Sequence, residues 1–270
     1  IKNRVRNKEK VLIVCNTVKQ AQRVYNCLKE IKSRSGLLHS KFILGDRERI
    51  EMDIGSLDLL VGTQAIEVSL DIDYNVCYSE PAPIDALIQR FGRINRQRGK
   101  GICEVYVFTR GSEQDAYIYD DFLVKRTLDE LADMDLLHEW LMQEATDRVY
   151  QGGFGKGEKL FSDTRRVFAQ VIDEIVPFSN ADRSESDFYR LFNSIEAVPE
   201  MFRTEYLDCI QAGDVYGAMQ YTLPLSRGQY HRLKSEGRIS ASDGMLFVNA
   251  VYDRDLGLLI ERRDPRAFTD

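Results

Sequence analysis

The chain has 270 residues, of which 43% are hydrophobic and 30% charged, and its formal net charge is −6. This composition is ordinary for a soluble globular chain of one large or two modest domains. No apolar run approaches the length of a membrane span, and residues 1–10 are polar and basic. We therefore expect neither a membrane segment nor a secretory signal.

Charge is divided unevenly along the chain. Residues 1–112 hold 19 Lys and Arg against 13 Asp and Glu, a net charge of +6, whereas residues 113–270 hold 18 against 30, a net charge of −12. This split predicts two modules, of which only the first attracts a phosphate backbone. The five cysteines form no C-x-x-C pair and the three histidines lie far apart. We expect buried free thiols in a reducing cytoplasm and no metal bound by this chain.

The first hundred residues alternate between strand and helix patterns. Residues 11–15 form a continuous apolar run, typical of a strand buried on both faces, and Thr17 with Gln20 indicates the capping box of the helix that follows. Further strands are predicted at 37–40, 57–61, 74–78 and 102–108. This order predicts an α/β fold, a parallel sheet with flanking helices.

Polar residues follow the first three of these strands. Asn16 and Thr17 come after the first, His39 and Ser40 end the second, and the third is followed by Gly62, Thr63 and Gln64. Each has a local explanation, such as a helix cap or a turn. Because ligands collect at the carboxyl ends of parallel strands, the residues together favour a binding site.

Residues 85–96 predict an amphipathic helix. At helical spacing, Leu87, Phe91 and Ile94 share one face, while Gln89, Arg93 and Arg96 share the other. Arginine suits phosphate because its planar fork gives paired hydrogen bonds and stays charged. The alternative is a surface helix whose cations suit the negative end of its dipole.

Residues 89–96, Gln-Arg-Phe-Gly-Arg-Ile-Asn-Arg, resemble the Q/H-R-x-G-R-x-x-R signature, motif VI, of superfamily 2 helicases. Residues 61–73 resemble motif V, and the first strand with Asn16 and Thr17 resembles motif IV. The wording of residues 67–73 and 38–42 is similar to the helicase–nuclease family of type I CRISPR systems. The resemblance covers about residues 8–110 and implies the second of two RecA-like domains.

The resemblance also implies roles for individual residues. Those expected to stabilise charge on the γ-phosphoryl group of ATP are Arg93 and Arg96, with Gln89 nearby. Those expected to lie near the nucleotide are Asp71 and Arg90. Those expected to hold nucleic-acid phosphates are Thr17, His39, Ser40, Thr63 and Gln64.

The partners implied by the resemblance are single-stranded DNA, the first RecA-like domain, a nuclease domain and a CRISPR surveillance complex. ATP and Mg²⁺ would be held mainly by the first RecA-like domain, because no G-x-x-x-x-G-K-[ST] loop occurs in this sequence. Residues 152–157 are glycine-rich but follow no buried strand, so a connector is expected there. We expect the chain alone, as half of a motor, to be inactive.

Three segments are predicted. Residues 1–112 form the RecA-like domain, 113–157 a helical linker ending in the glycine-rich connector, and 158–270 a small mixed α+β accessory domain. In the last segment, 188–192 and 201–210 have helical patterns, and 246–251 with 256–260 form a predicted hairpin. The predicted function is the C-terminal half of an ATP-dependent translocase on single-stranded DNA in CRISPR antiviral defence. The alternatives are half of an RNA helicase and a non-catalytic nucleic-acid-binding scaffold.

Overall fold

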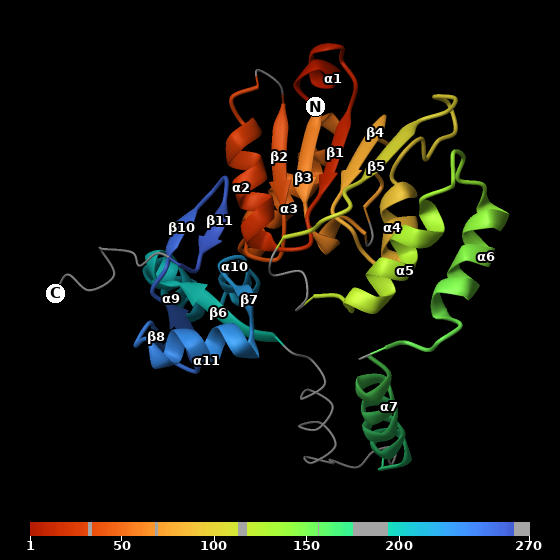
Figure 1. The fold of residues 1–270 in the computed structure, drawn as a ribbon. Coiled ribbons are helices and arrows are strands. Elements are labelled where there is room, and N and C mark those ends of the chain that lie inside the picture. Colours follow the sequence, from red (N-terminus) through yellow and green to blue (C-terminus); the bar gives the residue numbers. More distant parts are fainter. Residues whose placement is uncertain (32–33, 68–69, 113–117, 156, 175–193, 262–270) are drawn as a thin grey trace.

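The computed structural model describes residues 1–31, 34–67, 70–112, 118–155, 157–174 and 194–261 (Figure 1). A five-stranded parallel sheet in the order β2-β3-β1-β4-β5 organises the first part of the chain. Its strands are β1 (Val11–Val14), β2 (Ser35–Leu38), β3 (Leu59–Gly62), β4 (Val76–Ser79) and β5 (Glu104–Val107). The predicted parallel sheet with flanking helices is confirmed.

The burial of the strands follows their sequences. Every residue of β1 and β3 is buried, as expected of continuous apolar runs in the middle of a parallel sheet. Strand β5 forms an edge, and its residues alternate between exposed and half-buried. The helices and 3₁₀ turns of this part are α1 (Lys2–Arg6), α2 (Val18–Leu28), α3 (Leu44–Asp53), η1 (Ile54–Ser56), η2 (Gln64–Ile66) and α4 (Ile84–Phe91).

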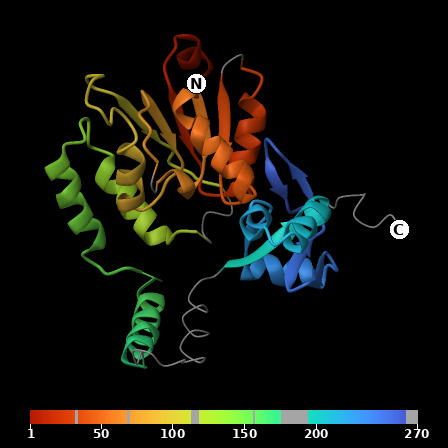
Figure 2. The same cartoon turned by 180° about the vertical axis from the view of Figure 1, so that it is seen from behind.

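Two helices, α5 (Asp121–Leu131) and α6 (Glu139–Tyr150), pack on α4 and confirm that the linker is helical. Their shared cluster contains Ile84 of α4 with Leu123, Met142, Ala145 and Val149. Figure 2 shows the same helices from behind, on the α4 side of the sheet. The segment between them lies at the surface, since Leu136 and Leu137 are exposed, and so is Trp140 in the first turn of α6. A loop with two glycines at positive φ leads to α7 (Gly157–Glu174).

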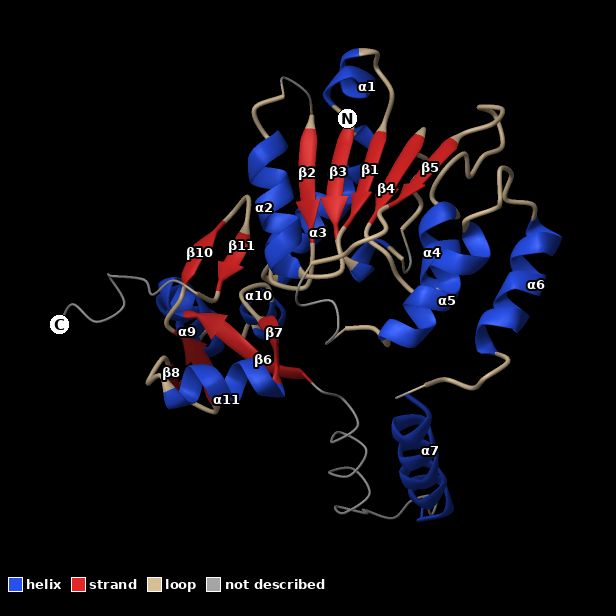
Figure 3. Ribbon diagram, in the orientation of Figure 1, coloured by secondary structure: helices blue, strands red, loops and turns tan. Residues whose placement is uncertain are grey.

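Residues 194–261 form a second module, coloured by element type in Figure 3. Its four-stranded sheet has the order β7-β6-β9-β8 and is accompanied by a two-stranded hairpin, β10-β11. The strands are β6 (Ser194–Pro199), β7 (Leu223–Ser226), β8 (Ile239–Ser242), β9 (Met245–Val248), β10 (Val251–Asp253) and β11 (Gly257–Leu259). The helices are η4 (Glu200–Phe202), α9 (Arg203–Gln211), α10 (Val215–Met219) and α11 (Arg227–Ser235).

The helical prediction for residues 201–210 and the hairpin prediction are confirmed. One detail of the hairpin is wrong, because the segment expected as a single strand is divided between β9, which pairs with β8 and β6, and β10. The helical pattern at 188–192 lies outside the described residues.

The second module shares a hydrophobic core with the first sheet. One cluster contains Ile13 and Val61 of the sheet together with Leu225 and Phe247 of the module. Backbone hydrogen bonds cross the same boundary, from Leu44 N to Thr222 O at 2.9 Å and from Leu258 N to Lys41 O at 2.8 Å. We call residues 39–46, which make most of these contacts, the seam. Through the seam the module fixes the position of the chain that follows β2.

Candidate functional site

The helix that carries the arginine motif is shorter than predicted. Helix α4 ends at Phe91, and Gly92 caps it with a backbone N–H bond to Ile88 O of 2.9 Å. The expected common helical face of Gln89, Arg93 and Arg96 is therefore wrong, although Gln89 is exposed on α4. The arginines stand on a turn of residues 92–96, which we call the arginine turn.

The arginine turn is attached to the loop that follows β3. Tyr74 N donates to Arg93 O at 2.9 Å, and Asn95 N donates to Tyr74 O at 3.0 Å. Asn95 adopts φ +48°, a conformation that asparagine tolerates better than most residues. Backbone pairing, rather than helical periodicity, thus sets the positions of the arginines.

Arg93 is buried, and among the described residues its hydrogen bonds go to backbone carbonyls. Its side chain is 9% exposed and donates from Nη1 to Leu70 O at 2.7 Å and from Nη2 to Glu67 O. Nε is buried and has no hydrogen-bond partner in the described structure. Burial and the neighbouring Arg96 lower the pKa of Arg93, but a guanidinium remains charged at any physiological pH. A buried cation with two neutral partners and a buried nitrogen that lacks one is suited to an anionic ligand.

Arg96 and Asp71 meet at the solvent edge of the same loop. Arg96 Nε lies 3.2 Å from Asp71 Oδ1, and the Asp71 side chain is 91% exposed. Arg96 N also donates to Asp73 Oδ1 at 2.8 Å. Asp71, Arg93 and Arg96, which the resemblance places near the nucleotide, are therefore neighbours in the structure. The ion pair of Arg96 with Asp71 is exposed, so it can be exchanged for another partner at little cost.

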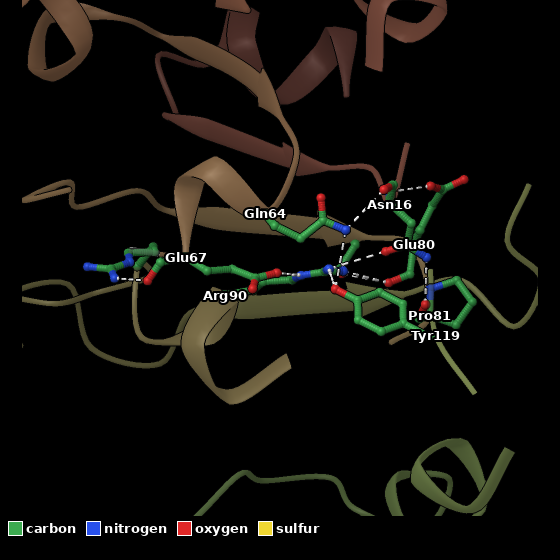
Figure 4. A network of polar contacts seen from close by, with 9 residues as sticks. Asn16, Gln64, Glu67, Glu80, Pro81, Arg90 and Tyr119 are labelled. Carbon is green, nitrogen blue, oxygen red and sulfur yellow. Dashed lines mark hydrogen bonds and ion pairs between the residues drawn. The ribbon is translucent and has the colours of Figure 1, made fainter. Parts of the chain in front are cut away.

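Arg90 contradicts its predicted role as a nucleotide contact. The residue is 0% exposed, and all five of its N–H donors have an acceptor (Figure 4). The acceptors are Glu67 Oε1 at 2.8 Å, Ser79 Oγ at 2.9 Å, Glu80 O at 3.1 Å, Asn16 Oδ1 at 3.2 Å and Tyr119 Oη at 3.0 Å. An arginine has no further donor, so Arg90 has none left for a ligand.

Gln64 belongs to the same internal network. Its amide nitrogen donates to Asn16 O at 3.0 Å and to Tyr119 Oη at 3.4 Å (Figure 4). Both amide N–H groups therefore point inward, so the geometry of Gln64 does not support the predicted contact with a phosphate. Asn16, 2% exposed, joins the network to β4 through Glu80 at 2.7 Å and Pro81 O at 2.8 Å.

Three of the residues predicted to hold nucleic-acid phosphates lie at the carboxyl ends of β1, β2 and β3. Thr17 is half-buried and caps α2, accepting from Gln20 N at 3.2 Å as predicted. Ser40 is half-buried, whereas Thr63 is only 3% exposed. The parallel register places all three along the carboxyl ends of the strands, which we call the carboxyl edge of the sheet.

His39 also follows β2, but its side chain is not accessible to a nucleic acid. Its ring is 0% exposed and stacks on Phe42, with 4.5 Å between ring centroids. Nδ1 accepts from Lys41 N at 3.1 Å, and the opposite nitrogen therefore donates to Leu256 O at 3.1 Å. Burial lowers the pKa of His39 to about 3, so the ring is neutral. The prediction that His39 holds a phosphate is wrong, because the seam uses both nitrogens.

A cavity of about 700 Å³ opens at this edge between the first turn of α2 and the ends of β4 and β5. Its cations are Lys19, Arg23 and Arg110, and Thr17 also lines it. The aromatic rings of Tyr78 and Phe108 form part of its wall. The sequence analysis missed these residues, but Arg110 follows a predicted strand and meets the same strand-end rule that singled out Thr17.

The remaining expectations concern cysteines, metals and membranes. All five cysteines are free thiols, but only Cys15 and Cys77 are buried as expected, whereas Cys103 and Cys209 are half-buried and Cys27 is exposed. The described residues contain no group of three or more His, Cys, Asp or Glu side chains able to hold a metal ion. Within the same residues, no helix is long and apolar enough to cross a membrane.

Comparison with known proteins gives a consistent result. A protein-family model described as "CRISPR-associated nuclease/helicase Cas3, C-terminal" matches residues 7–99. The CRISPR-associated nuclease/helicase Cas3 of Streptococcus thermophilus is 35% identical over 140 residues, 43% of this chain and 15% of that protein. The Cas3 of Methanothermobacter thermautotrophicus is 31% identical over 203 residues, 70% of this chain and 24% of that protein. The matched part of this chain thus spans a quarter or less of these relatives.

Solved structures share the fold. The crystal structure of T. fusca Cas3-ATP superposes with a TM-score of 0.67 at 18% identity, covering 95% of this chain and 39% of that one. A chain of a CRISPR RNA-guided surveillance complex, pre-nicking, has a TM-score of 0.59 at 18% identity, covering 93% of this chain and 40% of that one. At such identities the likeness concerns the fold alone, and it extends over both modules.

Proposed function

We propose, from the match of residues 7–99 to the Cas3 C-terminal family model, that the chain supplies one half of an ATP-driven motor that moves along single-stranded DNA in CRISPR defence. Its half contributes arginine fingers and contacts to the DNA backbone. The single observation that carries the proposal is Arg93, a buried guanidinium with only carbonyl partners and an unused Nε. A scaffold has no need of such a group.

The residues around the arginine turn fit a triphosphate held by a facing domain. ATP, when bound, supplies the γ-phosphoryl group whose hydrolysis drives the motor. In this proposal the Arg93 guanidinium stabilises the developing negative charge, and Arg96 adds a second cation after leaving Asp71. Asp71 then remains as an exposed acceptor for the nucleotide, and Gln89 donates from α4. Mg²⁺ belongs to the facing domain.

DNA phosphates lie along the carboxyl edge of the sheet in this proposal. Thr17 and Ser40 offer hydroxyl donors there, and Lys19, Arg23 and Arg110 offer charge at the cavity. Thr63 positions the backbone that follows β3. Phosphate contacts of this kind hold a strand without reading its sequence, which suits a translocase. Tyr78 and Phe108 add rings on which a base can stack.

The nucleotide half of the proposal is tested in the complete polypeptide, with its phosphate-loop domain. Arg93→Ala should lower DNA-stimulated ATP hydrolysis by about 10³–10⁵, as the loss of an arginine finger does elsewhere. The control is Arg98→Ala, an exposed arginine two residues beyond the arginine turn, which should leave hydrolysis unchanged. If Arg93→Ala hydrolyses ATP at a near-normal rate, the arginine turn is only a charged surface.

The DNA half is tested by binding of a labelled oligonucleotide to the 270-residue chain across a salt series. Arg110→Ala should weaken binding and reduce the slope of log affinity against log salt by about 0.7, the value for one phosphate contact on a single strand. The control is Arg34→Ala, because this exposed arginine precedes β2 and does not line the cavity. Equal effects of the two substitutions would show that binding follows net charge and not this edge.

The surveillance complex is the partner we propose for the assembled motor. A chain of the same fold occurs in a surveillance complex. The machine would work in the cytoplasm, where the free thiols of this chain remain reduced.

A further inference from the structure

Tyr119 lies outside the matched family region, yet its hydroxyl reaches the middle of the site. It precedes α5 and is half-buried, with its ring against the cluster of Ala82, Ala86 and Leu87. Its hydroxyl oxygen accepts from Arg90 Nη2 at 3.0 Å and from Gln64 Nε2 at 3.4 Å. Tyr119 is thus the point at which the linker touches the network of Figure 4.

The two donors that meet at this oxygen come from different sides of the site. Gln64 follows Thr63, at the edge proposed for DNA. Arg90 binds the Glu67 carboxylate through Nε at 2.8 Å, and the backbone carbonyl of the same Glu67 accepts from Arg93. A path of four hydrogen bonds therefore connects Gln64, through Tyr119, Arg90 and Glu67, to the arginine turn.

We propose that the hydroxyl of Tyr119 is a positioning group that holds Gln64 and Arg90 together, and thereby couples the DNA edge of the sheet to the placement of Arg93. Tyr119 touches neither ligand in this scheme. The coupling of turnover to DNA rests on the proposed function, but the positioning itself is a property of this chain. The linker accordingly takes part in the site and does more than connect modules.

The hydroxyl can be removed without disturbing the ring. Tyr119→Phe keeps the contacts with Ala82, Ala86 and Leu87 but leaves Arg90 with four acceptors and Gln64 with one. The chain also offers a matched control, because Tyr150 of the same linker donates from its hydroxyl to Asp85 Oδ1 of α4 at 2.5 Å. Tyr150→Phe removes an equivalent linker–α4 bond outside the network.

The first experiment measures hydrogen exchange in the 270-residue chain without nucleotide or DNA. The reporting amides are those of Glu67, bonded to Gln64 O at 3.0 Å, and of Arg93, bonded to Arg90 O at 3.1 Å. In Tyr119→Phe both should exchange at least roughly 2- to 10-fold faster, which is the range for a single hydrogen bond, because the variant loses the bonds from Arg90 and from Gln64. In Tyr150→Phe they should exchange as in the unmodified chain.

The second experiment measures ATP hydrolysis by the complete polypeptide with and without single-stranded DNA. Tyr119→Phe should reduce the ratio of the two rates by a similar factor, roughly 2- to 10-fold, while Tyr150→Phe keeps it. If single-stranded DNA does not stimulate ATP hydrolysis by the unmodified polypeptide, the proposed function is wrong. The hydrogen-exchange result would still decide the role of Tyr119. Unchanged exchange in Tyr119→Phe, or equal acceleration in both variants, would overturn the positioning role.

Discussion

Arg90 and Arg93 stand three residues apart in one motif, and the structure predicts opposite consequences for their loss. Arg90→Ala removes the partner of the Glu67 carboxylate, whose side chain is 11% exposed, and takes one donor away from each of four other buried or half-buried acceptors. Breaking a buried ion pair by deleting one partner costs about 3–5 kcal/mol. That is a large part of a typical unfolding free energy of about 5–15 kcal/mol.

Arg93→Ala should cost far less. It removes two hydrogen bonds to backbone carbonyls, but it also removes a buried Nε that has no partner, so the net loss should be about 1–2 kcal/mol. Glu67 keeps its bond to Arg90 in this variant.

The assay is urea unfolding of the 270-residue chain at fixed pH and salt, followed by far-ultraviolet circular dichroism. Arg90→Ala should lower the unfolding free energy by about 1–4 kcal/mol more than Arg93→Ala. In the complete polypeptide, by contrast, the rate of ATP hydrolysis per folded molecule should fall more in Arg93→Ala than in Arg90→Ala. Equal stability losses in the two variants would refute the assignment of Arg90 to structure and Arg93 to chemistry.

Three further outcomes are expected. Highly purified 270-residue chain should hydrolyse ATP no faster than buffer in a phosphate-release assay, and sustained turnover would contradict the half-motor reading, since the sequence has no phosphate loop. Gly257→Ala, where a Cβ would lie 2.5 Å from Lys41 O, should lower the melting temperature more than Gly213→Ala, where φ is similar (+75° against +70°) but the space is open. His39 has a pKa of about 3 in the folded chain and near 6.5 when unfolded, so the unfolded state binds more protons between these pH values. The unfolding free energy should therefore fall by up to about 1.4 kcal/mol per pH unit as the pH drops from 6.5 towards 3. If His39→Gln shows the same dependence of unfolding free energy on pH in a urea series, this expectation is wrong.

The sheet could be predicted from the sequence because its signal is local. Residues 11–14 and 59–62 are continuous apolar runs, and each is buried throughout. The rule that ligands gather at strand ends then placed Thr17, Ser40 and Thr63 at one edge without any knowledge of tertiary structure. The end of α4 was misplaced because periodicity continues formally through Arg96, whereas the backbone pairing of residues 93–95 with Tyr74 takes over after Gly92.

The misassigned residues share a physical cause, since their partners are distant in sequence. His39 is closed in by Leu256, 217 positions away, and Arg90 draws its acceptors from Asn16, Glu67 and Tyr119. A motif specifies that an arginine is present, but whether its five donors face inward or outward depends on the assembled elements. Tyr119 was overlooked for the same reason, because nothing in its neighbourhood along the chain predicts a contact with Gln64.

The seam restricts how the contributions of the two modules can be separated. Phe42 and Ile43 are 2% and 5% exposed, and they belong to the cluster that also contains residues of the second module. Lys41 donates to Pro224 O, and Asp46 accepts from Tyr252 Oη at 2.8 Å. Removing the module would return Lys41 and Asp46 to water, but it would also expose the apolar side chains that the module covers, at a cost of several kcal/mol.

A truncated chain that fails to bind DNA would therefore report lost folding and not a lost DNA contact. Point substitutions avoid this ambiguity, since Lys19 and Arg110 line the cavity and lie outside the seam. The exposed ion pair of Lys19 with Glu261, at 2.8 Å, is the kind of surface contact that contributes about 0–1 kcal/mol, so Lys19→Ala should alter charge at the edge while the fold persists. Loss of DNA affinity in a Lys19→Ala chain that melts normally would then locate binding on the basic module itself.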